Sequence, residues 1–161
     1  IELIVVIAII GVLAAILVPS MMGYVGDSKL STANANAKLV YTNTATYATK
    51  CEVAGYPMNA ACTIATATSL QEANVTGQVA APTAQPTGTD LTNALKQLMG
   101  SSTTAAGVFK VDVNASGTPT FAAWAKTADD QYVGAYPNAT TAKTAGKIAG
   151  VTATFTGDST N

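Results

Sequence analysis

The chain has 161 residues and a formal net charge of −1, with 48% hydrophobic and only 11% charged side chains, a size that suits one domain plus an appendage. All eight basic residues are lysines, which argues against a nucleic-acid partner because phosphate recognition depends on arginine and on clustered basic charge. Histidine is absent and the carboxylates are scattered along the chain, so we expect no enzyme, no metal site and no cofactor.

The chain begins IELIVVIAIIGVLAAILVPS, an apolar run that contains a single acid, Glu2. A carboxylate without a partner costs several kcal/mol in hydrocarbon. The first basic side chain, Lys29, would lie roughly 40 Å from Glu2 along a helix that rises about 1.5 Å per residue. Glu2 therefore needs a cation from elsewhere, and the nearest kind is a free α-amino group, belonging to this chain or to a copy of it.

The composition changes after about residue 26, which divides the chain into a hydrophobic projecting helix (1–26) and a globular head (27–161). A helical stripe continues into the head at alternating spacings of three and four. We therefore expect one helix from the N-terminus to about residue 50, roughly 75 Å long and much longer than a small domain is wide. The stripe consists of Leu30, Ala33, Ala37, Val40, Thr44, Tyr47 and Cys51.

The rest of the head is expected to form a loop, a short helix and an antiparallel sheet. TDLTNALKQLMG predicts a helix capped by Thr89 or Asp90 and ended by Gly100. Alternating segments then predict strands in VFKVDV, TPTFAAWAK, YVGAYP and IAGVTATF, joined by turns such as NASG and ADDQ. The sheet would pack its apolar face on the stripe, which gives an α+β fold of one long helix against about four antiparallel strands.

Cys51 and Cys62 are the only cysteines, with ten residues between them. Two interpretations are open: free buried thiols, or a disulfide that closes a loop just after the helix. We favour the disulfide because a membrane-inserted, threonine-rich chain looks exported. A loop of this length would contribute about 3 kcal/mol to stability in the chain-entropy estimate.

The segment IELIVVIAIIGVLAAILVP closely resembles the N-terminal helix of type IV pilins, whose mature chains usually begin with a methylated Phe, then Thr-Leu, then this Ile-Glu. The resemblance covers about the first 50 residues, and beyond them only the general order of helix, variable loop and antiparallel sheet. This chain departs from the family by starting at Ile1, so we expect three residues to be missing before it.

The resemblance implies a role for Glu2 and a set of partners. In pilus filaments the N-terminal helices bundle in the core, and the acid that corresponds to Glu2 is held to pair with the N-terminal amine of a neighbouring subunit. Before assembly the helix would wait in the cytoplasmic membrane, where the expected upstream residues bring it near the length of a span. The implied partners are identical subunits in a helical homopolymer, a prepilin peptidase and the pilus assembly machinery.

Two helix-weakening residues, Gly11 and Pro19, interrupt the apolar run. Proline in a helix interior costs about 3 kcal/mol and glycine up to about 1 kcal/mol. One interpretation is a simple kink at Pro19. The other, which resembles what pilus filaments show, is that Val12 to Val18 partly melts on assembly and lets the filament stretch; we favour melting because both residues are present.

We therefore predict the major subunit of an extracellular type IV pilus that supports adhesion or motility. The first alternative is a pseudopilin of a type II secretion or DNA-uptake system. The second is a membrane-anchored binding module, in which Glu2 would be incidental. A signal-peptide core is disfavoured because it would lack the acid. Nothing in the sequence of the head marks a binding site.

Overall fold

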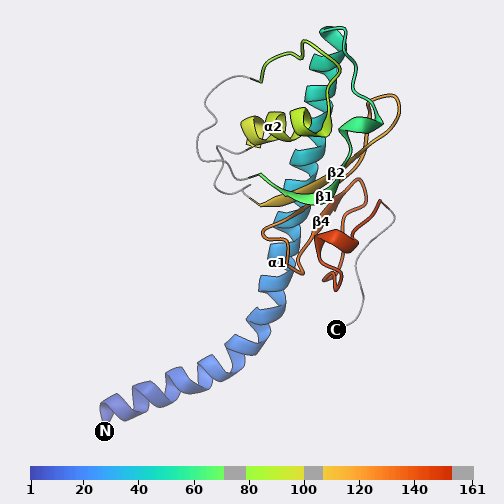
Figure 1. The fold of residues 1–161 in the computed structure, drawn as a ribbon. Coiled ribbons are helices and arrows are strands. Elements are labelled where there is room, and N and C mark those ends of the chain that lie inside the picture. The colour runs from blue at the N-terminus through green and yellow to red at the C-terminus, as the bar shows by residue number, and fades with distance from the viewer. Residues whose placement is uncertain (71–78, 100–106, 154–161) are drawn as a thin grey trace.

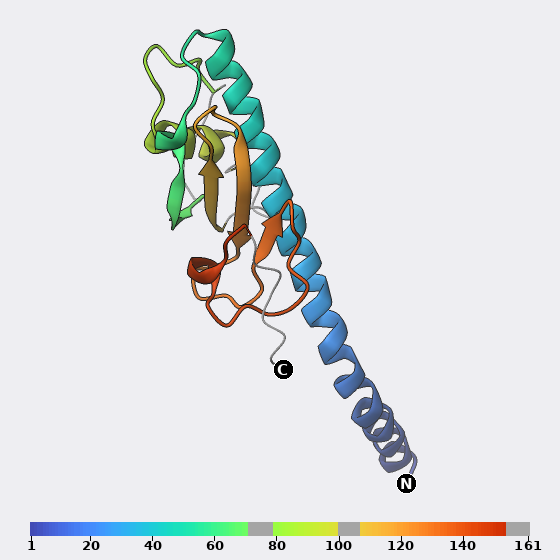
Figure 2. The same ribbon diagram turned by 90° about the vertical axis from the view of Figure 1, so that its right-hand side faces the viewer.

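A computed structural model describes residues 1–70, 79–99 and 107–153. The longest element is helix α1 (Glu2–Val53), whose N-terminal half projects from a head that is built around its C-terminal half (Figure 1). Figure 2 shows the sheet and its connecting loops lying along one side of α1. The predicted α+β fold is confirmed: one long N-terminal helix packs against a four-stranded antiparallel sheet.

Helix α1 extends slightly past the expected end and stops at a glycine. Gly55 has a φ of 82°, and the backbone N–H of Tyr56 donates to the carbonyl of Cys51 at 3.0 Å, which satisfies a carbonyl at the helix end. The helix buries one face only. Its buried residues are the predicted stripe with Asn36 added: Leu30, Ala33, Asn36, Ala37, Val40, Thr44, Tyr47 and Cys51.

The sheet is a meander in the order β1-β2-β3-β4, and all of its pairs are antiparallel. The NASG turn joins β2 to β3. In this turn the Asn114 side chain accepts hydrogen bonds from the N–H groups of Ser116 and Thr118, and Gly117 has a φ of 79°, which favours glycine. The strands are β1 (Ile64–Ser69), β2 (Val108–Val113), β3 (Pro119–Ala125) and β4 (Gly134–Tyr136).

Both faces of the sheet are buried, so the head has three layers. Alternate residues of β3 point to opposite faces: Ala122 and Trp124 join the core shared with α1, whereas Phe121 and Ala123 join a smaller core on the other face. That second core is closed by the C-terminal 3-10 turn (Ile148–Gly150). Lys110 is a buried charged residue, with only 9% of its surface exposed. Its Nζ donates hydrogen bonds to the carbonyls of Ala149 and Val151, in and just after this turn.

The prediction for the strands was wrong at two places. IAGVTATF was expected to be the last strand, but its described part forms the 3-10 turn and irregular chain; Thr154 and Phe155 lie outside the described residues. Ile148 and Val151 are both fully buried in the second core. A helical turn places residues three apart on one side, whereas a strand would point them to opposite faces. The first strand, β1, was not predicted at all.

Helix α2 (Gly88–Met99) was expected, but its cap is not the one predicted. The Asp90 carboxylate accepts hydrogen bonds from the N–H and Oγ1 of Thr87, at 2.8 and 2.7 Å, so Thr87 precedes the helix and Asp90 bonds back to it from the first turn. These bonds lower the pKa of Asp90 below its ordinary value. The predicted end at Gly100 lies outside the described residues.

One side chain, Asn34, fixes α1 to the end of the sheet. Its Oδ1 accepts from Ala135 N at 3.0 Å, from Thr140 N at 3.1 Å and from Thr140 Oγ1 at 3.0 Å. Its Nδ2 donates to the carbonyl of Thr140 at 2.9 Å. These bonds join residues more than 100 positions apart in the chain.

We expect Asn34→Ala to lower the free energy of unfolding by about 3 kcal/mol, because part-buried N–H groups of Ala135 and Thr140 lose their acceptor. Denaturant titration followed by the fluorescence of Trp124 would measure this loss. Asn43→Ala is the matched control, since Asn43 is half-buried on the same helix and its side chain makes no hydrogen bond with the described part of the chain. Equal stability of the two variants would contradict the role given to Asn34.

Candidate assembly surface

The N-terminal half of α1 is an apolar rod with no partner in the described structure. Residues 1–25 are all exposed, Gly26 is half-buried, and Leu30 is the first buried position. Five consecutive residues, Leu3 to Ile7, are each at least half exposed and all apolar, so the rod has no polar face. A helix that is hydrophobic all round is stable only when apolar material surrounds it.

By length and composition, α1 is able to cross a membrane. It contains an 18-residue window with mean hydropathy 3.0, and none of that window is buried against the rest of the chain. No charged side chain occurs between Leu3 and Gly26. The rod can therefore be embedded in lipid, or in a bundle of like helices, without burying a charge other than Glu2.

Glu2 lies in the first turn of α1, and no basic side chain pairs with it in the described structure. The carboxylate is placed at the N-terminal end of the helix, where the helix dipole favours negative charge. The helix is unbroken from Glu2 to Lys29, so the nearest lysine of the same chain is roughly 40 Å away along the axis. No lysine side chain of the same chain can therefore reach Glu2 in this conformation.

Gly11 and Pro19 are both inside α1, which is continuous through them. A Cβ added at Gly11 would meet no atom within 4 Å. The Ser20 hydroxyl, next to Pro19, donates to the carbonyl of Leu17 at 2.9 Å. Figure 1 shows the projecting half of α1 curving away from the axis of the half that lies in the head. Whether this segment melts during assembly remains a prediction for the assembled state.

The other predicted residues of α1 lie together in the head core. Ala33, Ala37, Val40 and Tyr47 belong to one hydrophobic cluster between α1, α2 and the sheet. Leu30 is also buried, at 8% exposure, and marks the point where α1 enters the head. These residues hold the rod to the head and present no surface to a partner.

The predicted disulfide is not formed in this structure, where Cys51 and Cys62 are both free and fully buried. Cys62 Sγ donates to the carbonyl of Pro86 at 3.2 Å, and Cys51 lies one turn after Tyr47 on α1. Burial raises the pKa of both thiols above the ordinary value of 9.0 and raises that of Tyr47 as well.

These raised pKa values predict a loss of stability at alkaline pH. A group whose pKa is higher in the folded state stabilises the fold below its unfolded pKa, and this contribution disappears as the pH rises towards the folded value. We therefore expect the free energy of unfolding, measured with reductant by urea titration, to fall as the pH rises above about 9. The control is the double variant Cys51→Ala with Cys62→Ala, which should show a smaller slope; equal slopes would contradict this.

No family model matches this sequence, and no curated protein or solved structure is detectably similar to it. Within the described ranges no group of three or more His, Cys, Asp or Glu side chains is placed to hold a metal ion. The candidate site therefore consists of the rod of α1 and the carboxylate of Glu2.

Proposed function

We propose that this chain is the structural subunit of a type IV pilus, and that it polymerises through the rod of α1 with Glu2 selecting the position of each new subunit. The observation that supports this most is an apolar helix without a polar face, exposed over 25 residues, with one unpaired acid at its tip. The resemblance of the same segment to pilins agrees with it.

The energetics of the rod favour burial against other helices. Sixteen residues extend from Leu3 to Val18, and burying large apolar side chains contributes about 1.5–3 kcal/mol each. The gross gain is therefore of order 20–40 kcal/mol, which exceeds the several kcal/mol needed to desolvate one ion pair. Hydrophobic burial can hold the polymer together, and the ion pair can then set its register.

Glu2 also gives a reason why the subunit would leave the membrane and join the filament. Lipid and a helix bundle both satisfy the apolar side chains, so these residues distinguish little between the two environments. An unpaired carboxylate is costly in lipid, whereas beside the amine of a neighbouring subunit it is paired. The charge therefore favours the assembled state. A contact between the end of one subunit and another part of the next, repeated without closing into a ring, produces an open helical filament.

The test is cryo-electron microscopy of material sheared from producing cells, with the subunit identified from side-chain density. The proposal expects a helical filament of this chain in which Glu2 faces the N-terminus of a neighbour. The same maps would show whether Val12 to Val18 is melted. Retention of the whole chain in membranes, with no filament in the sheared fraction, would favour the pseudopilin and the membrane-anchored module instead.

A further inference from the structure

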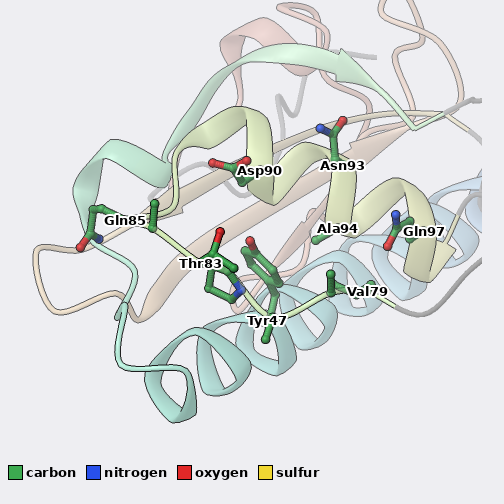
Figure 3. Close-up of a pocket in the computed structure, with 12 residues that line it drawn as sticks. Tyr47, Val79, Thr83, Gln85, Asp90, Asn93, Ala94 and Gln97 are labelled. Carbon is green, nitrogen blue, oxygen red and sulfur yellow. The ribbon is translucent and has the colours of Figure 1, made fainter.

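A cavity of about 300 Å³ lies in the head beside the C-terminal part of α1, between α2 and the segment 79–85 (Figure 3). Three of the residues that line it, Tyr47, Val79 and Ala94, are buried and largely apolar, and we call them the floor of the cavity. Because this end of α1 is opposite the projecting rod (Figure 1), the cavity is remote from the part of the chain that enters a membrane or a helix bundle.

Part of the cavity rim is polar, beside apolar residues of the segment 79–85, and the fold leaves several of the polar side chains without a hydrogen-bond partner in the described part of the chain. Asn93 and Gln97 lie along α2, and neither amide makes a hydrogen bond with the described part of the chain; the same holds for the Thr83 hydroxyl. Asp90 uses one carboxylate oxygen, Oδ2, for both bonds from Thr87, which leaves Oδ1 for another donor.

Gln85 also lines the cavity, but unlike Asn93 and Gln97 its side-chain amide already makes a hydrogen bond within the fold. Its Nε2 donates to the carbonyl of Pro57 at 2.5 Å, and Figure 3 shows its side chain turned away from the other labelled residues. The cavity therefore offers two amides, one hydroxyl and one carboxylate oxygen above an apolar floor. A site with an apolar floor and a few convergent polar groups is typical of small-molecule binding.

The composition of the rim restricts the chemistry of the ligand. Asp90 is the only charged residue among the described residues that line the cavity, so none of these residues offers a positive group to hold an anion. The amides and the hydroxyl can both donate and accept hydrogen bonds, which matches a molecule that carries several hydroxyl groups. The volume lies at the lower end of the range for ligand pockets, which suits one ring and excludes a peptide or an oligosaccharide buried whole.

We propose that this cavity binds a single neutral sugar ring, a hexopyranose. Its C–H face would lie on the floor of Tyr47, Val79 and Ala94, and its hydroxyls would bond to Asn93 and Gln97. Asp90 Oδ1 would accept from a further hydroxyl. This inference does not rest on the polymerisation of the chain, because the described residues that line the cavity all belong to the head of one chain.

The experiment uses the full chain in micelles of a polyoxyethylene detergent, which carries no sugar head group. The probes are the methyl glycosides of glucose, galactose, mannose and N-acetylglucosamine, with glucuronate and glucosamine as charged probes. Binding would be measured by NMR, from saturation transfer to each probe and from the side-chain amide signals of Asn93 and Gln97. We expect saturable binding of at least one neutral glycoside with a Kd of order 1 mM, and shifts of both amide signals.

The double variant Asn93→Ala with Gln97→Ala should weaken that binding about tenfold or more, because two hydrogen bonds are lost. Neither amide supports the fold, so the variant should remain folded and should assemble as the unmodified chain does. Thr89→Ala is the matched control, since Thr89 is exposed on the same helix and does not line the cavity. Its affinity should be unchanged.

Three results would overturn the proposal. The first is the absence of saturable binding by every neutral glycoside up to about 50 mM. The second is equal affinity of the double variant and the Thr89→Ala control. The third is tighter binding of glucosamine than of each neutral sugar, which would make Asp90 the centre of an amine site. None of them bears on filament formation, so a failure here leaves the proposed function to its own test.

Discussion

Replacing Glu2 with glutamine should abolish most filament assembly while the chain still inserts into the membrane. The amide keeps the size of the side chain but removes the charge that a neighbouring amine would pair with. Leaving one partner of a buried ion pair alone costs about 3–5 kcal/mol, so each subunit addition should weaken by roughly 100-fold or more. The measurement is the amount of this chain in the sheared fraction relative to the membrane fraction.

Two further variants separate charge from packing. Glu2→Lys should assemble no better than Glu2→Gln, because it places two cations together. Ile4→Leu conserves volume two residues away, and we expect filaments at close to the normal yield because volume-conserving apolar changes are tolerated best. The head should be equally stable in all three variants, since residues 1–25 are all exposed and Glu2 and Ile4 lie at the far end of the projecting rod. Normal filament yield from Glu2→Gln would leave the membrane-anchored module as the better explanation.

The sequence was most informative where one periodic pattern extends over many residues. The stripe from Leu30 to Cys51 has a helical period over six turns, and the structure buries its members on one face. The strand β1 was missed because its residues, IATATS, are small and mostly exposed. Such an edge segment has little pattern of its own, and its pairing with β2, which is irregular in register, decides its conformation.

The two sites differ in how far the sequence could reveal them. Glu2 can be recognised from the sequence because a single acid in an apolar run is unusual, whatever fold the chain adopts. The cavity in the head cannot be recognised in this way, because Tyr47 is far along the chain from the segment 79–85 and α2, and the two parts meet only through folding. The spacing of Asp90, Asn93 and Gln97 at three and four residues does place them on one side of a helix, but the same spacing is common on any solvated helix.

Gly134→Ala should be the most damaging substitution among the described glycines of the head. A Cβ at this position would lie 2.0 Å from the carbonyl carbon and oxygen of Ala33 and 2.3 Å from the backbone nitrogen of Asn34. These are backbone atoms of α1, so no flexible side chain can move aside. Strand β4 must shift away from the helix, which also stretches the bond from Ala135 N to Asn34. We expect a loss of about 3 kcal/mol in the free energy of unfolding.

Thermal unfolding followed by the fluorescence of Trp124, the only tryptophan, would show this as a Tm lower by about 10 °C. The control is Gly23→Ala, which makes the same chemical change on α1, where an added Cβ meets nothing within 4 Å. Alanine is favoured over glycine in a helix interior by about 1 kcal/mol, so this variant should be as stable as the original chain or slightly more stable. Equal Tm values for Gly134→Ala and Gly23→Ala would contradict this prediction, because they would show that the close approach of β4 to α1 does not stabilise the head.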